Sequence, residues 1–192
     1  TSPSPVLSTA SSAPGPESHA QPAIHRFEVA LHPIDAGAAV GLPLVTLVGG
    51  DAAFAATLAE ALRARGVDVV VGAATADRGT VFLGGLAPVT SVATARETVR
   101  SAFAAAQHSR LDKDGAWITV TTLGGDFGLT GTDRASSVLA GLAGLTKTIA
   151  REHPEARVRT IDLDSVDVEV LAAELTRSGP VEVSLLQGKR NT

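Results

Sequence analysis

Short apolar runs alternate with helical segments along most of this 192-residue chain. The run at residues 44–48 ends in two glycines, and the following segment, 52–65, carries apolar residues at helical spacing until it meets Gly66. A second apolar run follows at 67–71. These segments predict a strand–helix–strand unit whose parallel strands require a right-handed crossover. A chain with this order is constrained to fold as an α/β domain.

The same alternation continues to the end of the sequence. We predict further strands at 80–83, 116–122, 157–163 and 181–186, and helices at about 92–108, 134–152 and 168–177. Pro154 ends the helix before it, because proline disfavours the helical conformation of its predecessor. An alternating apolar segment at 24–31 predicts one more strand with a single buried face. The fold class is therefore α/β, a Rossmann-like doubly wound parallel sheet with flanking helices.

The amino-acid composition indicates which kinds of core, partner and metal site this chain can have. The residues are 44% hydrophobic but include only one Trp and five Phe, so Ala, Val and Leu must fill the core, as is usual for buried parallel strands. The net charge is −4, without the basic cluster that nucleic acid requires. No apolar stretch reaches the roughly 18 residues of a membrane span. No cysteine is present for disulfides or thiolate metal sites. We expect a cytoplasmic protein without nucleic-acid or membrane partners.

Residues 1–22 differ in amino-acid composition from the rest of the chain. They are dominated by Pro, Ser, Ala and Thr, which cannot bury enough surface to offset the entropy lost on ordering. We predict an interdomain linker at 1–22 and a domain at 23–192, with a remnant of cloning as the alternative for the first segment. The start lacks the pattern of a secretory signal. The chain begins with Thr rather than Met, which suggests a piece of a longer chain.

The turn after residue 48 is where a Rossmann-type domain would bind a dinucleotide. Short-chain reductases carry Thr-Gly-x-x-x-Gly-x-Gly there. In this sequence Gly49 is kept, but Ala53 and Ala55 stand at the later glycine positions, and Asp51 adds a carboxylate where phosphates would lie. Arg78 is the only nearby candidate to meet a 2′-phosphate. We predict a tight strand–helix turn and no cofactor cradle.

Residues 135–147 resemble the active-site helix of short-chain reductases. That family needs a Tyr-x-x-x-Lys pair, in which the ammonium lowers the pKa of the phenol that passes the proton. This sequence contains no tyrosine at all, and the two positions fall on Ala135 and Leu139, while Lys147 matches a later, non-catalytic lysine. A serine of the family corresponds to Thr121 or Thr122. We expect no catalysis at this helix.

The other polar residues do not form a recognisable site. His25, His32 and His108 stand singly, without the spacing of metal ligands. The carboxylates of residues 112, 114, 162, 164 and 167 are interpreted as turn and strand-end groups, and Asp133 as a helix cap. The Gly-x-Ser-x-Gly motif of serine hydrolases does not occur. We therefore predict no catalytic, cofactor-binding or metal-ligating residue in this chain.

A more specific resemblance covers residues 23–190. The Gly-Leu helix at 140–151, the corner Glu152-His153-Pro154-Glu155 and the strand 159–163 resemble the structural subdomain of polyketide synthase ketoreductases. Two further segments of this chain resemble that subdomain: the opening strand with His25-Arg26-Phe27, and the ending at 181–190. The segments 125–129 and 144–147 resemble most the iterative enediyne and polyunsaturated-fatty-acid synthase branch.

In that family a ketoreductase consists of two Rossmann-like halves. The first half is truncated, binds no cofactor and braces the second, which binds NADPH and carries the catalytic Ser, Tyr and Lys. The resemblance implies that this chain is the first half. Its partners would be the catalytic subdomain of the same polypeptide and a neighbouring acyl carrier protein domain, which holds the β-ketoacyl group that is reduced.

Two readings from other classes stay open. One is a free-standing small-molecule binder with its ligand at the carboxyl ends of the strands. Its site would be lined by Gly84, Gly85, Thr121, Thr122, Gly124 and Gly125. The other is a self-associating scaffold without a ligand.

Overall fold

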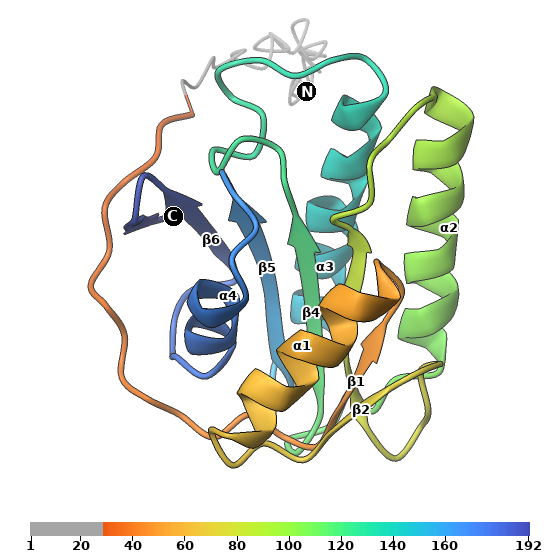
Figure 1. Ribbon diagram of the computed structural model, residues 1–192, viewed down its shortest axis with the longest axis vertical. Coiled ribbons are helices and arrows are strands. Elements are labelled where there is room, and N and C mark those ends of the chain that lie inside the picture. Colours follow the sequence, from red (N-terminus) through yellow and green to blue (C-terminus); the bar gives the residue numbers. More distant parts are fainter. Residues whose placement is uncertain (1–28) are drawn as a thin grey trace, which may run out of the picture.

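The computed structural model describes residues 29–192, and these form a single mostly parallel sheet with helices on both faces (Figure 1). The strands are β1 (Val45–Val48), β2 (Val69–Val71), β3 (Gly79–Gly85), β4 (Ala116–Thr121), β5 (Arg157–Leu163), β6 (Glu182–Leu186) and β7 (Lys189–Asn191). The helices are α1 (Ala52–Arg63), α2 (Val92–Gln107), α3 (Ala140–Glu152) and α4 (Val168–Leu175), with a 3-10 turn, η1 (Ser136–Leu139), before α3. The predicted α/β class is confirmed.

The strand order is β2-β1-β3-β4-β5-β6-β7, with only β7 antiparallel to its neighbour. The usual dinucleotide-binding order, 3-2-1-4-5-6, places two strands outside the first. Here β2 alone lies outside β1. The first half of the sheet is therefore one strand short, and the order of the strands reverses between β1 and β3.

The helix predicted at 134–152 divides into two parts. The Asp133 carboxylate accepts hydrogen bonds from the backbone N–H groups of Ala135 (2.8 Å) and Ser136 (3.1 Å). These bonds precede a tight 3-10 turn, and the regular helix begins only at Ala140. Asp133 thus holds the turn that leads into η1. The predicted role as N-cap of the helix is wrong, because the N-cap positions of η1 and α3 are Ala135 and Leu139, and neither provides a side-chain cap.

Strand β7 was not predicted, because it has only three residues and all of them are polar. It follows β6 through Gln187 and Gly188, which have φ angles of +51° and +73°. Two successive positive φ values are typical of the two-residue hairpin turns that match the twist of the strands. The hairpin adds an antiparallel edge to the sheet.

The strand predicted at 24–31 is not observed where the structure describes the chain. Residues 24–28 lie outside the described part, and Val29 to Leu31 are not paired. The pairing comes slightly later, where His32 and Thr192 exchange two backbone hydrogen bonds of 2.9 Å. The segment 32–34 thereby covers the outer edge of β7. The predicted linker at 1–22 lies outside the described residues and stays a prediction.

Two hydrophobic layers enclose the sheet. Helices α1 and α4 pack on one face through Leu58, Leu62 and Leu171, and α2 and α3 pack on the other through Ala102 and Leu142. Figure 1 shows α1 and α4 in front of the sheet and α3 behind it. Alanines are frequent in both layers, and their small side chains allow the helices to approach the strands closely.

The position of α4 breaks a general rule of α/β folds. The chain steps from β3 to β6 in one direction along the sheet, with α2 and α3 on one face but α4 on the other. The β5–α4–β6 crossover therefore has the opposite hand to the rest and is left-handed (Figure 1). About 98% of such connections are right-handed, and the predicted β1–α1–β2 unit follows the rule.

Candidate functional site

Open α/β sheets bind ligands at the carboxyl ends of the strands where the strand order reverses, which here is the edge formed by β1 and β3. Gly49 and Gly50 follow β1 with φ angles of +74° and +77°. A Cβ at Gly50 would lie 2.9 Å from the Cβ of Leu83, and one at Gly49 would lie 3.3 Å from the amide of Gly84. The two glycines therefore let the turn close down on the end of β3.

Asp51 occupies the place where a phosphate would meet the helix. Its Oδ1 accepts a hydrogen bond of 2.8 Å from the N–H of Phe54, which caps α1. Helix N-terminal N–H groups are the donors that bind phosphates, and here one of them is already used by a carboxylate that also repels anions. Ala55 is buried in the core beneath this turn, whereas Ala53 is exposed.

Arg78 does not lie near this turn. It immediately precedes β3 and is therefore at the amino-terminal edge of the sheet, where its guanidinium pairs with Asp68 at 2.9 Å. Because parallel strands place their carboxyl ends on one side, Arg78 and Asp51 lie at opposite edges. Arg78, the only nearby basic residue that the sequence suggested for a 2′-phosphate, therefore lies away from the turn where the phosphate would bind.

The positions that match the reductase Tyr and Lys carry no ionisable group. Ala135 is half-buried in the turn before η1, and Leu139 is buried in the apolar layer with α2 and α3. Lys147 points to the surface, where its Nζ lies 3.1 Å from a carboxylate oxygen of Glu182. Ala135 and Leu139 have no group that can pass a proton, and the ammonium of Lys147 is paired with Glu182.

Thr121, at the end of β4, is committed to a structural hydrogen bond. Its hydroxyl donates to Oδ1 of the fully buried Asp162 at 2.6 Å. The same carboxylate accepts the N–H of Leu123 at 2.7 Å and that of Phe127 at 2.9 Å. Asp162 therefore joins the ends of β4 and β5 and holds the loop after β4, whereas Thr122 is exposed.

A second carboxylate shapes the same loop from within. Asp126 is buried, and its two oxygens accept the N–H groups of Gly128 (2.8 Å) and Thr130 (2.9 Å). Gly125 has a φ of +71°, and a Cβ there would overlap the carbonyl of Leu185. Burial opposes ionisation of Asp126, but the hydrogen bonds from the Thr130 side chain and from the loop N–H groups outweigh it and lower the pKa of this carboxyl below its ordinary value.

This arrangement predicts acid sensitivity. Since the pKa of Asp126 is lower in the folded than in the unfolded chain, its carboxylate contributes stability above the unfolded value of about 3.9, and this contribution is lost as the pH falls through the folded value. Urea unfolding from pH 7 to pH 3 should show a steeper loss for the wild type than for Asp126→Asn. Parallel curves would contradict the assignment.

Part of the lining proposed for a free-standing binder is filled by packing. A Cβ at Gly85 would overlap the carbonyl of Val120, Thr121 is buried, and Gly125 packs on β6. These three residues are buried, whereas Thr122 and Gly124 of the proposed lining are exposed. A cavity of about 380 Å³ does lie beside them, and it is lined by Gly50, Asp51, Phe54, Leu86, Ala87, Pro88 and Val166.

The remaining candidates have structural roles or stand alone. His25 lies outside the described residues, His32 is exposed, and Nδ1 of His108 lies 2.8 Å from the carbonyl of Ala104. Asp112 and Asp114 pair with Arg110 in one turn, Asp164 accepts the N–H of Gln187, and Asp167 caps α4. Within residues 29–192, no group of three or more potential ligands could hold a metal ion.

Sequence reasoning missed a buried ionic network under α4. Glu174 accepts from Arg159, and also from Arg190, whose Nε and Nη2 lie 2.7 and 2.9 Å from its two oxygens. The side chains of Glu174, Arg159 and Arg190 are only 1%, 3% and 7% exposed. A signal was present, because the two-residue period of β5 puts Arg159 on the inward face with Ile161 and Leu163.

Arg157 extends this network to the backbone. Its guanidinium donates to the carbonyls of Gly41 (2.9 Å), Leu175 (2.8 Å) and Arg177 (2.6 Å). Burial, and then the charge of Arg159, lower the pKa of Arg157 to about 10. Arg157 still carries its charge at neutral pH, and it binds the segment before β1 to the end of α4.

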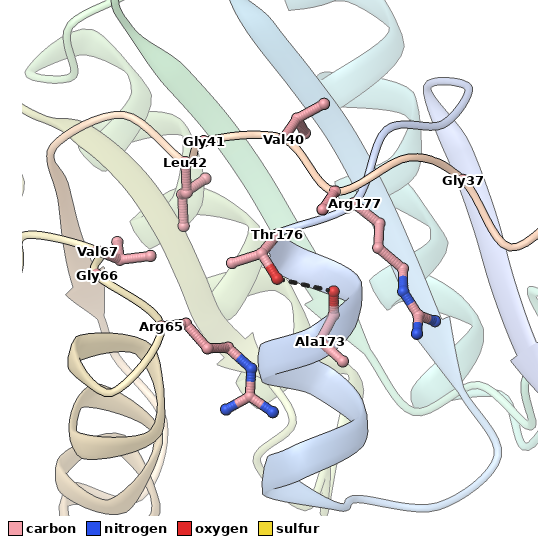
Figure 2. A pocket seen from close by; sticks show the side chains of 11 residues that line it. Gly37, Val40, Gly41, Leu42, Arg65, Gly66, Val67, Ala173, Thr176 and Arg177 are labelled. Carbon is pink, nitrogen blue, oxygen red and sulfur yellow. Dashed lines mark hydrogen bonds between the residues drawn. The ribbon is translucent and has the colours of Figure 1, made fainter.

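The largest cavity described, about 670 Å³, lies at the amino-terminal edge between that segment and the ends of α1 and α4 (Figure 2). Arg65 and Arg177 are at its rim, but Figure 2 shows that their guanidinium groups do not converge. Arg65 is already paired with Glu169 at 2.7 Å. Because helix carboxyl ends disfavour anions, we interpret this cavity as a seam between packed elements.

None of the described helices combines the length and apolar character needed to cross a membrane.

Comparison with known proteins yields structures but no family. No protein-family model matches the chain, and no curated protein matches it. A solved structure of the adenylation, ketoreductase and pseudo-Asub domains of a keto acid-selecting NRPS module aligns with 84% of this chain at a TM-score of 0.53 and 15% identity. This chain spans 18% of the length of that multidomain chain. A candidate betaketoacyl-ACP reductase aligns with 62% of this chain, over 72% of its own, at a TM-score of 0.44 and 19% identity. At these identities the likeness concerns the fold alone, which is Rossmann-like.

Proposed function

We propose that this chain is the non-catalytic structural half of a polyketide synthase ketoreductase, nearest the iterative enediyne and polyunsaturated-fatty-acid branch, and that it works in the cytoplasm. It braces a catalytic subdomain that binds NADPH and reduces β-ketoacyl groups held on a carrier protein. The observation that carries this proposal is the use of the active-site positions for packing. Ala135 is half-buried, and Leu139 is buried in the core. The hydroxyl of Thr121 is hydrogen-bonded to Asp162.

The absence of cofactor binding is supported by two independent features. Asp51 already caps α1 and places a negative charge where the pyrophosphate would be. The sheet also has only β2 outside β1, so the half of the sheet that flanks a dinucleotide is shortened. Both features oppose NADPH binding: the charge of Asp51 repels the pyrophosphate, and the shortened sheet offers less surface for the dinucleotide to contact.

A partner subdomain is supported by apolar side chains on the surface. Among the described residues, the large apolar side chains that are at least 47% exposed are Val29, Val71, Phe103, Leu129, Val166 and Val170. Single exposed apolar residues are common on monomers, but apolar surface is also what interfaces cover. The proposal therefore expects the catalytic subdomain to cover part of this set.

Calorimetric titration of the chain with NADPH tests the cofactor part of this proposal. We expect no binding heat at micromolar concentrations, because the carboxylate of Asp51 and the closed glycine turn leave no site for the pyrophosphate. The same titration of a catalytic subdomain should give a clear isotherm and serves as the positive control. Micromolar binding to this chain alone would overturn the proposal.

The gene itself provides the decisive observation on the partner. A Thr-Gly-x-x-x-Gly-x-Gly motif followed by Tyr-x-x-x-Lys within the hundred codons after Thr192 would support the ketoreductase assignment. A stop codon at that point would remove it and leave the alternatives of a small-molecule binder or a self-associating scaffold. Light scattering on the purified chain separates these two, since only the scaffold requires a dimer or a larger assembly.

A further inference from the structure

We propose that the cavity above Gly50 and Asp51 binds an apolar ligand with a cationic head group, of the size and chemistry of an aromatic or branched-alkyl amine. This inference goes beyond the bracing role and does not depend on it. It assigns a binding site to the edge of the sheet at which a dinucleotide would otherwise be held.

The location of the cavity is that of a ligand site in this class of fold. It lies between the turn after β1, the loop after β3 and the loop after β5, at the carboxyl edge where the strand order reverses. Gly50 closes against Leu83 beneath it. Its floor is therefore formed by packed backbone, and its walls come from three separate loops.

The lining selects for an apolar body. Phe54, Leu86, Pro88 and Val166 supply the side chains, together with Ala87. The volume of about 380 Å³ lies at the small end of the range for ligand cavities, which is roughly 300–1,000 Å³. A single ring or a branched alkyl group with a short head fits this description better than a nucleotide does.

Asp51 selects the charge of the head group. One carboxylate oxygen caps Phe54 at 2.8 Å, and among the described residues the other has no hydrogen-bond donor or cation assigned to it. No Lys or Arg lines the cavity. The N-terminus of α1 contributes about half a positive charge, which the full negative charge of Asp51 exceeds. The net field in the cavity therefore favours cations over anions.

Three probes of nearly equal shape separate these contributions. A ¹⁵N-labelled sample of the chain is titrated with 2-phenylethylamine, 2-phenylethanol and phenylacetate, and amide shifts are followed by NMR. We expect shifts at Gly50, Phe54 and Val166. The dissociation constants should increase from the amine to the alcohol to the carboxylate, with the amine binding about two- to five-fold more tightly than the alcohol, as one exposed ion pair provides.

Two substitutions test the two parts of the site. Asp51→Asn keeps the helix cap, since Asn is as good a capping residue as Asp, and it removes the charge. In this variant the amine and the alcohol should bind equally. Val166→Ser should weaken all three probes, whereas Val170→Ser should not, because Val170 is similarly exposed but lies outside this cavity.

Three results would overturn the proposal. These are phenylacetate binding as tightly as the amine, an unchanged preference for the amine in Asp51→Asn, and shifts that lie outside the cavity or are absent at about 20 mM probe. Each of these outcomes is independent of the NADPH titration and of the gene sequence. Failure here would leave the proposed bracing function untouched.

Discussion

Replacing Glu174 by alanine is expected to lower the free energy of unfolding by about 3–5 kcal/mol, the usual cost of removing one partner from a buried ion pair. Among residues 29–192, Glu174 is the only carboxylate that contacts the buried guanidinium groups of Arg159 and Arg190. Without it, two positive charges remain in the interior with only carbonyl groups around them. For Arg159, burial already lowers the pKa, and Glu174 opposes that shift.

Glu169→Ala is the matched control for this prediction. It removes the same charge from the same helix, but the Glu169 side chain is 71% exposed and its pair with Arg65 lies at the surface. Such a pair contributes about 0–1 kcal/mol. Urea unfolding followed by circular dichroism compares the two variants. If both lose the same stability within about 1 kcal/mol, the network is not the support that we infer.

The Glu174 variant should also loosen the segment before β1. Arg190 donates to the carbonyls of Asp35 and Ser178, and this orientation depends on the Glu174 carboxylate, which accepts from its Nε and Nη2. Hydrogen exchange should therefore be faster at the backbone amides of Ile34 and Val40 in Glu174→Ala than in Glu169→Ala. Equal protection in both variants would show that the segment is held by its backbone pairing alone.

Asp162→Ala is the second substitution with a large expected effect. It leaves the hydroxyl of Thr121 and the N–H groups of Leu123 and Phe127 without their acceptor. Buried donors without a partner cost about 1–3 kcal/mol each. The free energy of unfolding should therefore fall by at least about 3 kcal/mol, and the loop from 122 to 133 should lose its fixed conformation.

Asp162→Asn and Asp164→Ala sharpen this test. The asparagine oxygen can still serve Thr121 and Leu123, but its NH₂ group would face the N–H of Phe127, so an intermediate loss is expected. Asp164 is exposed, and water can replace its bond to Gln187, so Asp164→Ala should change little. In urea unfolding, the loss of stability should be largest for Asp162→Ala, intermediate for Asp162→Asn and smallest for Asp164→Ala. A smaller loss for Asp162→Ala than for Asp162→Asn would contradict the role assigned to the Asp162 carboxylate.

Much of the fold was predictable because it depends on local patterns. The strands at 44–48 and 157–163 and the helices at 52–65 and 92–108 were located by apolar periodicity, and the observed elements differ by at most a few residues at their ends. Of the strand predicted at 24–31 only residues 29–31 are described, and these are not paired. Alternation of apolar residues says nothing about where an unpaired sheet edge is available. The edge strands of the described sheet are β2 and β7, and residues 32–34 pair with the outer side of β7.

The candidate site was predictable in chemistry but not in geometry. From the sequence we predict that Asp51 stands where a phosphate contact would be, and that Ala135 and Leu139 stand at the positions that match the reductase Tyr and Lys. The sequence did not show that Arg78 lies at the opposite edge, because that depends on which end of β3 it precedes. Nor did it show Val166 beside Phe54, since these residues come from loops far apart in the chain.

The sequence by itself determined the order of most strands and helices and showed that these residues include no tyrosine, because both follow from residue types and local periodicity. Only the tertiary structure decided the face on which α4 packs, the antiparallel edge at β7 and the burial of Arg159, Glu174 and Arg190. Charged residues are normally predicted to be exposed. Their burial becomes favourable only when partners from separate elements meet, and no local pattern records that meeting.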